Sequence, residues 1–188
     1  MRGAAAALAH FRAIAVVAVV AVAVAGCSGG DPPVPKGFTE FRTDVYAFAH
    51  PTGWQRENGE DQRGRPILTF RGPATPGGVD GQVHVGRLDH YGQNLNVQLG
   101  QFRGLALMHT YTIKADRAIE MEGAARAHRF EADYELVDGN GSRVPFTLLG
   151  MYVLTDDGIL LEFMLRSPRR GTAHARLPEI FNSFRLID

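Results

Sequence analysis

Four histidines raise the question of a metal site, because imidazole nitrogen is a common metal ligand. His84 and His90 are an even number of residues apart, so they share a face if both lie on one strand, but at about 3.3 Å per residue they stand about 20 Å apart. One Zn²⁺ needs each nitrogen within about 2.1 Å. His109 and His128 could join them only through the fold. The sequence therefore predicts neither a metal site nor a bound cofactor.

Asp138, Asn140 and Ser142 match the first, third and fifth ligand positions of a calcium-binding loop. The sixth position, where the loop needs glycine, is Arg143, and the twelfth, where it needs glutamate, is Leu149. The same stretch, DGNG, contains Gly and Asn residues that accept positive φ. We therefore expect a β-hairpin turn here in place of a calcium site.

Carboxylates and serines that could act in catalysis do not occur in a recognised arrangement. Glu120 and Glu122 are two residues apart on an expected strand and share a face, but a glycosidase needs a cleft around such a pair, and a solvated strand face is the simpler interpretation. Ser142, Ser167 and Ser183 do not stand in a G-x-S-x-G nucleophile elbow; they fall in a turn, at a strand end and at a helix end. We expect the protein not to be an enzyme.

Two segments could bind a ligand without catalysis. The glycine-rich stretch Gly72–Gly86 lacks the Lys-Ser/Thr of a phosphate-binding loop, so we interpret it as a long loop between strands, a common place for binding residues. Pro51 and Gly53 favour a tight turn before Trp54. The Trp54 ring could plug the end of a sheet or stack on a ligand, and the sequence favours the plug.

The N-terminus has the layout of an export signal. Arg2 and Arg12 precede the uncharged run Ala13–Ala25, and small residues follow it. This run is too short for a membrane-spanning helix, which needs about 20 apolar residues. The sequence therefore predicts a signal peptide over residues 1–26.

The end of this run, Val24-Ala25-Gly26-Cys27, resembles the bacterial lipobox. The resemblance implies cleavage between Gly26 and Cys27, diacylation of the Cys27 thiol, and anchoring on the extracytoplasmic face of the cell membrane. Two acyl chains are what stable anchoring requires. Cys27 is also the only cysteine, so it cannot form a disulfide within the chain. The alternative is an ordinary signal peptide with an incidental cysteine.

A tether follows, residues 27–37, and the folded domain is expected over residues 38–188. The tether contains SGGDPPVPKG, in which glycines give flexibility and prolines give extension. At about 3.1 Å per residue it spans about 30 Å. Such a tether holds a domain just off a membrane surface.

The charge of the mature chain excludes one class of partner. The whole chain has 20 basic and 20 acidic residues, and removal of Arg2 and Arg12 leaves 18 minus 20, or −2. Nucleic-acid binding requires a basic surface that contacts the phosphates, so we expect no nucleic-acid partner. The Arg, Ala, Gly and Pro usage suggests a GC-rich bacterium such as an actinobacterium.

The mature chain carries strand patterns along most of its length. Arg126–Leu136 alternates apolar and charged residues, Val144–Leu154 is apolar on both faces, and Ile159–Arg166 alternates again. Turn sequences join these three, which predicts an antiparallel meander with a central covered strand. Three upstream segments also fit strands: Val45–His50, Ile67–Arg71 and Gln82–Leu88.

Two segments have helical spacing of apolar residues, Asn94–His109 and the stretch from Leu177 to Phe184. Pro178 is tolerable only in the first turn of the second helix. Strands with two helices set apart in the chain predict an α+β fold, an antiparallel sheet with helices packed on it.

The segment Val45–Trp54 (VYAFAHPTGW) resembles the N-terminal signature of the PsbP/Mog superfamily: an aromatic strand, a proline and then Gly-Trp. The closing IFNSF, Ile180–Phe184, and the order of elements over roughly Phe38–Asp188 also resemble that family. With the lipobox, the chain is similar to LpqN-type PsbP-like lipoproteins of actinobacteria. PsbP assists an oxygen-evolving complex and Mog proteins bind a GTPase, so the resemblance implies binding of a protein partner. It implies no particular ligand residue.

We therefore expect a membrane-anchored, non-catalytic binding domain for a protein or envelope component. The alternative is a carrier or sensor of a small apolar or lipid ligand, with a pocket between sheet and helix lined by Phe102, Met108 or Phe163. A third possibility is an enzyme or metalloprotein, which would require histidines to converge with a carboxylate.

Overall fold

The computed structural model describes residues 32–61, 63–75 and 78–187. They belong to one compact unit that begins at Pro32. The expected signal peptide, the cleavage site at Gly26 and the acylation site at Cys27 lie outside the described residues. The unit contains both hydrophobic clusters described below, so it has what an independently folding domain needs.

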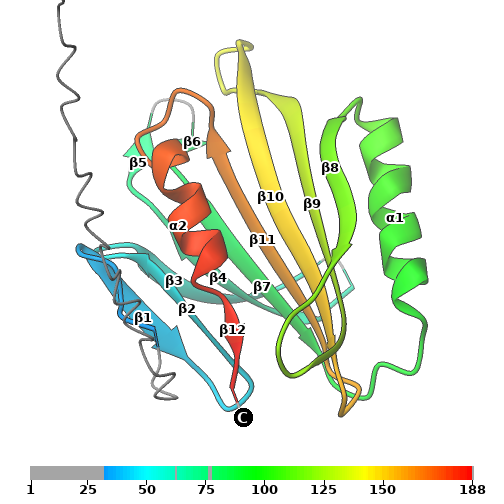
Figure 1. Cartoon of the computed structure of the whole chain (residues 1–188). Coiled ribbons are helices and arrows are strands. Elements are labelled where there is room, and N and C mark those ends of the chain that lie inside the picture. Colours follow the sequence, from blue (N-terminus) through cyan, green and yellow to red (C-terminus); the bar gives the residue numbers. More distant parts are fainter. Residues whose placement is uncertain (1–31, 62, 76–77, 188) are drawn as a thin grey trace, which may run out of the picture. The chain divides into compact units, whose positions relative to one another are not determined.

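The centre of the domain is a seven-stranded antiparallel sheet (Figure 1). Its last three strands in sequence form the expected meander, with β10 between the other two. From one edge to the other, the strands are β3 (Gln55–Glu60), β4 (Pro66–Arg71), β7 (Gln82–Leu88), β11 (Leu160–Pro168), β10 (Arg143–Thr155), β9 (Ala124–Val137) and β8 (Thr112–Ile119).

A second layer covers one face of this sheet. It consists of a three-stranded sheet and a short helix, α2 (Leu177–Asn182), which a 3₁₀ turn at His174–Arg176 precedes. Pro178 lies in the first turn of α2, as expected, where its missing N–H leaves no helical bond unmade. The small sheet contains β1 (Phe38–Arg42), β2 (Tyr46–Pro51) and β12 (Arg185–Leu186).

The main hydrophobic cluster lies between these two layers. Phe48, Phe70 and Phe163 are fully buried and their rings contact one another, with the Phe48 and Phe163 centroids 5.1 Å apart. Phe184, from the closing Ser-Phe, packs on Phe163 at 4.6 Å. Rings from β2, β4, β11 and the C-terminus thus join the layers, and a ring buries 150–250 Å².

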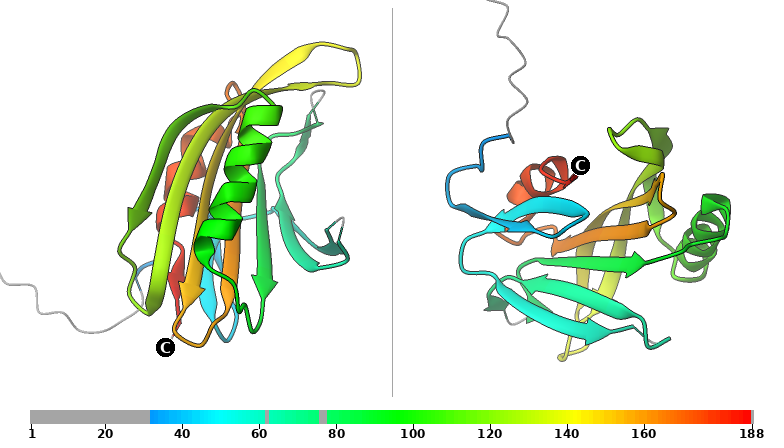
Figure 2. Two further views of the ribbon diagram at one scale, coloured as in Figure 1. Left: turned by 90° about the vertical axis from the view of Figure 1, so that its right-hand side faces the viewer. Right: turned by 90° about the horizontal axis from the view of Figure 1, so that it is seen from below.

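The helix α1 (Leu95–Met108) packs on the opposite face of the large sheet (Figure 2). Asn94 caps it, because its side-chain oxygen accepts the backbone N–H of Asn96 at 3.0 Å. A smaller cluster lies beneath α1, in which Phe102 stacks on Phe130 of β9 at 3.9 Å. Gly150 of β10 makes room for this pair, since a Cβ there would lie 2.2 Å from the Phe130 ring.

The predicted α+β class, the six predicted strands and both helices are confirmed, with ends that differ by at most two residues. The strands β1, β3, β8 and β12 were not predicted. In β3 the cause is plain: QRENGE is exposed along its whole length and has no apolar alternation. The paired hairpin Ala74–Thr75 and Gly78–Val79, β5 and β6, was also missed.

Candidate functional site

The large sheet is covered unequally, and α1 leaves part of its own face open. In the left view of Figure 2, α1 lies along one side of this face and β7 lies beside it without a covering helix. We call the resulting hollow, of about 280 Å³, the sheet groove. Its walls come from five strands and the segment after α1: Ile67, His84, Gly86, Tyr111, Tyr134, Leu148, Glu162, Met164 and Arg166.

Strand alternation on β11 gives the groove its charges. Leu161, Phe163 and Leu165 point into the main cluster, so Glu162, Met164 and Arg166 lie on the α1 side. The sequence prediction treated this second face of β11 as its outer face. The structure instead places both charged residues in the groove, where they are only partly exposed.

Glu162 marks one end of the groove and is already compensated. The Gln98 amide of α1 donates to its Oε1, and Arg65 Nη2 lies 3.7 Å from Oε2. Burial raises the pKa of Glu162, while the Arg65 charge opposes that effect. Gly86 lies close beside it, since a Cβ there would stand 3.1 Å from Glu162 Oε2. Gln98 thus ties α1 to the floor of the groove.

Arg166 occupies the other end, and His84 lies between the two ends, opposite Met164. Burial, with the charges of Arg166 and Arg71 nearby, lowers the pKa of His84 to about 4, so the imidazole is neutral at pH 7. The Arg166 Nε donates to Gln82 Oε1 at 2.7 Å. Tyr111 and Tyr134 stack at 4.7 Å and complete this end. It is therefore rich in hydrogen-bond donors.

The outward face of α1 is largely apolar, with Gln101 as its polar member. Arg103 is the only charged residue of the helix. Its guanidinium donates two hydrogen bonds, of 2.7 and 2.9 Å, to the Asp116 carboxylate of β8. Leu107 is 82% exposed and Met108 71% exposed. We call this face the α1 surface; its members are Val97, Gly100, Gln101, Gly104, Leu105, Leu107 and Met108.

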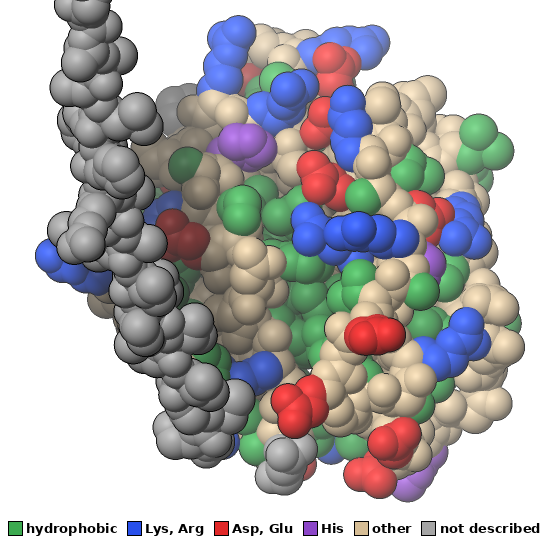
Figure 3. Space-filling model, in the orientation of Figure 1, with side chains coloured by type: hydrophobic (Ala, Val, Ile, Leu, Met, Phe, Trp, Pro, Cys, Tyr) green, Lys and Arg blue, Asp and Glu red, His purple; other side chains and the backbone are tan. Residues whose placement is uncertain are grey.

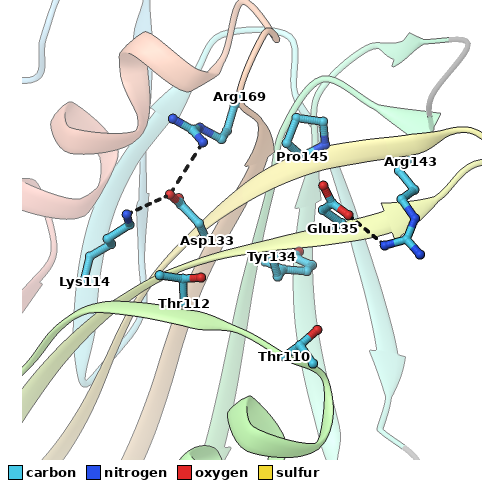
Figure 4. A pocket seen from close by; sticks show the side chains of 9 residues that line it. All are labelled: Thr110, Thr112, Lys114, Asp133, Tyr134, Glu135, Arg143, Pro145 and Arg169. Atoms are coloured by element: carbon cyan, nitrogen blue, oxygen red, sulfur yellow. Dashed lines mark hydrogen bonds and ion pairs between the residues drawn. The ribbon is translucent and has the colours of Figure 1, made fainter.

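The opposite side of the molecule is charged where the second layer ends. Figure 3 shows Lys, Arg, Asp and Glu side chains mixed over the upper part of that face. A polar hollow of about 400 Å³ lies there, in which Lys114 and Arg169 both point toward Asp133 (Figure 4). Asp133 also accepts from Thr147 Oγ1 at 3.0 Å. Its charge is satisfied within the protein, so this hollow has no evident demand for a ligand.

Trp54 is a plug in the folded domain, as the sequence favoured. The turn closes through a bond from Trp54 N to Pro51 O at 3.2 Å, with Gly53 at φ +90°. The ring is 9% exposed and packs on Gly72 and Gly81, where a Cβ would lie 3.1 and 2.8 Å from it. These glycines of the stretch Gly72–Gly86 therefore serve packing. The expectation that this stretch binds something stays a prediction.

Most of the reactive candidates are dispersed. Among the described residues, no group of three His, Cys, Asp or Glu side chains could hold a metal ion. His84 is in the groove, His90 in the turn after β7 and His109 at the end of α1. His128 bonds Asp116 through Nε2 at 2.5 Å.

Of two further predictions, one is confirmed and one is wrong. The Asp138 turn is the expected hairpin: its Oδ1 accepts the backbone N–H groups of Asn140 and Ser142 at 2.9 and 2.8 Å. The placement of Glu120 and Glu122 on a strand is wrong. Both are exposed in the turn between β8 and β9, because Gly123 at φ +75° reverses the chain there.

The expected lining of a ligand pocket is also wrong. Phe102 lies under α1 and Phe163 lies in the main cluster on the other face of the sheet. Met108 is on the α1 surface. The sequence missed the groove because strand pairing, not spacing along the chain, brings its walls together. The one available signal was a pair of charges, Glu162 and Arg166, within an otherwise apolar strand.

Comparisons with known proteins agree on the fold. No family model matches the sequence, and neither does any curated protein. Among solved structures, the cyanobacterial PsbP of Synechocystis sp. PCC 6803 aligns with a TM-score of 0.53 at 16% identity, over 88% of this chain and 99% of that one. This chain therefore has a PsbP-like fold, and the identity is too low to carry an activity.

Two further structures align with TM-scores below 0.5 and add nothing to that assignment. The Ran-binding protein Mog1p of Saccharomyces cerevisiae gives 0.47 at 12% identity, over 80% of this chain and 96% of that one. A protein of Bacteroides thetaiotaomicron gives 0.49 at 11% identity over 81% of this chain. This chain covers 49% of the Bacteroides protein.

Neither helix in the described residues is long and apolar enough to cross a membrane.

Proposed function

We propose that this protein is an LpqN-type lipoprotein whose PsbP-like domain, residues 38–188, binds a protein or envelope component without catalysis. Cleavage after Gly26 leaves Cys27 as a diacylated N-terminus on the extracytoplasmic face of the cell membrane. Five residue steps separate Cys27 from Pro32, which at about 3.1 Å each span about 15 Å. The domain then stays close to the bilayer.

The observation that carries the proposal is the α1 surface and its position. The chain enters the domain at Pro32–Pro35, which lie against Glu179 of α2 and Arg185 of β12. The α1 surface is on the other side of the large sheet. A domain tethered from the α2 side would present a largely apolar helix face away from its tether. Exposed apolar patches of this kind mark protein interaction sites.

The anchor is tested by intact mass after membrane extraction, with wild type compared to Cys27→Ala. The proposal expects wild type to lack residues 1–26 and to carry a diacylglyceryl group, and the variant to remain unprocessed. If both proteins are soluble and cleaved at the same place, Cys27 is incidental and the tethered arrangement is wrong.

A second candidate function is a carrier or sensor of a small apolar ligand. The sheet groove favours it, because Leu148, Met164 and Ile67 supply apolar walls and 280 Å³ is near the lower limit of ligand-sized pockets. The two functions are separable, since the groove and the α1 surface involve different side chains. If the protein is a carrier, a substitution at Met164 in the groove should weaken binding of an apolar ligand, and a substitution at Leu107 on the α1 surface should not.

A further inference from the structure

Arg166 is a cation without a carboxylate partner. Its Nε donates to the Gln82 amide oxygen at 2.7 Å. In residues 32–61, 63–75 and 78–187, no Asp or Glu oxygen lies within ion-pair distance of the Arg166 guanidinium. An Arg at a partly buried site normally pairs with a carboxylate or phosphate, because its planar fork matches their geometry.

The groups that accept hydrogen bonds from Arg166 among the described residues are neutral: the Gln82 amide oxygen and the Tyr134 hydroxyl oxygen. His84 carries no charge at pH 7, for the reason given above. Gln82 is 1% exposed, and its Nε2 finds no acceptor among the described residues. Such an orphaned buried donor is uncommon and costly. The hydroxyl groups of Tyr111 and Tyr134 belong to the same end of the groove.

The groove therefore has a polarity along β11. Glu162 and Arg166 are four residues apart on this strand, or about 13 Å. Gln98 and Arg65 compensate Glu162, whereas the charge of Arg166 is not compensated. Met164 lies between the two ends on β11. Leu148 of β10 is paired with Arg166, and Ile67 of β4 lies at the level of Glu162, because both Ile67 and Glu162 pair with Gly86 of β7.

We propose that the sheet groove binds an amphiphilic organic carboxylate, with the carboxylate on Arg166 and the apolar body running from Leu148 beside it, past Met164, to Ile67. The inference rests on the second candidate function and extends it by naming the head group. The carboxylate supplies the negatively charged acceptor that Arg166 lacks among the described residues. The apolar body of the ligand is buried against the apolar side chains of the groove, which removes it from water.

The test compares ligands with one apolar body and different head groups. Decanoate, decanol and decylamine are titrated calorimetrically into residues 28–188, below the concentrations at which they aggregate. The proposal expects decanoate to bind at least about tenfold more tightly than decanol, as one charge-assisted hydrogen bond would give. Decylamine is expected to bind more weakly than either.

Two matched variants assign the effect to Arg166. Arg166→Gln should weaken decanoate binding at least about tenfold and leave decanol unchanged. Arg143→Gln removes an exposed cation that pairs with Glu135 at 3.1 Å, and should change neither affinity. Urea unfolding checks that both variants fold, and Arg166→Lys, which keeps the charge, should retain part of the preference.

Methionine methyl NMR locates the ligand independently. Decanoate should shift the Met164 signal and leave Met151, buried on the other face, in place. If decanoate and decanol bind equally and Arg166→Gln changes neither, the carboxylate inference is wrong and the apolar carrier function survives. If neither ligand shifts Met164, both the inference and that function are wrong.

Discussion

The two faces of the large sheet are built differently. On the α2 side, twenty buried residues form one cluster among those described, and aromatic rings join its layers. On the α1 side, six buried residues form a smaller cluster beneath one helix. Beside that helix the sheet carries Glu162, His84 and Arg166 in a groove.

The difference separates stability from binding. Apolar burial contributes about 25 cal/mol per Å², so the larger cluster provides most of the cohesion of the domain. Partly buried charges on the α1 side cost desolvation free energy and stabilise nothing by themselves. A face that retains such groups is a candidate for recognition. Substitutions on the two faces should therefore differ in how much they lower the free energy of unfolding.

The largest expected effect is in the main cluster. Phe163→Ala should lower the free energy of unfolding by about 3–5 kcal/mol, because the ring is fully buried among Phe48 and Phe184. Phe102→Ala, at the edge of the smaller cluster, should cost less. Urea unfolding followed by circular dichroism measures both. An equal or greater loss in Phe102→Ala would remove the distinction between the faces.

The next effect depends on pH. The pKa of His84 is about 4 in the folded protein and about 6.5 when unfolded, so the unfolded chain binds the extra proton between these values. Stability should therefore fall as pH drops from 6.5 to 4, by at most about 3 kcal/mol from this group.

His84→Gln should flatten that part of the profile, as measured by urea unfolding at several pH values. Glu162 contributes with the opposite sign, because its raised pKa favours protonation in the folded state, so the comparison is of wild type with variant. His90→Gln, at an exposed histidine, is the control. Identical slopes for wild type and His84→Gln would mean that His84 is not held neutral by the fold.

A smaller effect tests the fit beneath α1. Gly150→Ala should cost about 1–3 kcal/mol, because the new methyl group meets the Phe130 ring and disturbs its stacking on Phe102. Gly100→Ala on the α1 surface has open space around its Cβ and should stabilise the domain by up to about 1 kcal/mol. Thermal unfolding should therefore show a lower melting temperature for Gly150→Ala and a higher one for Gly100→Ala. Two equal losses would contradict the packing described here.

The smallest effect on stability is expected on the α1 surface. Leu107→Asn should change the free energy of unfolding by no more than about 0.5 kcal/mol, since the side chain is 82% exposed. A loss above 2 kcal/mol, measured by urea unfolding, would show that Leu107 belongs to the core and is not available to a partner.

Alternation along single strands was enough to predict the α+β class, the meander and the covered strand β10. It could not predict β3, whose side chains are all exposed. It also missed the groove, because Glu162 faces Gly86 only through the pairing of β11 with β7. Two features decide which charged residues become half-buried. One is the register between strands far apart in sequence, and the other is the position at which α1 ends.

The central claim is that the α1 side is the binding face, and photo-cross-linking tests it most directly. A photoreactive side chain is placed at Leu107 or at Val34, which is 43% exposed on the tether side, in the lipidated protein on its own membrane. The account predicts a discrete adduct from position 107 that disappears in Cys27→Ala, and none of that mass from position 34. The same adduct from both positions, or from position 34 alone, would contradict it.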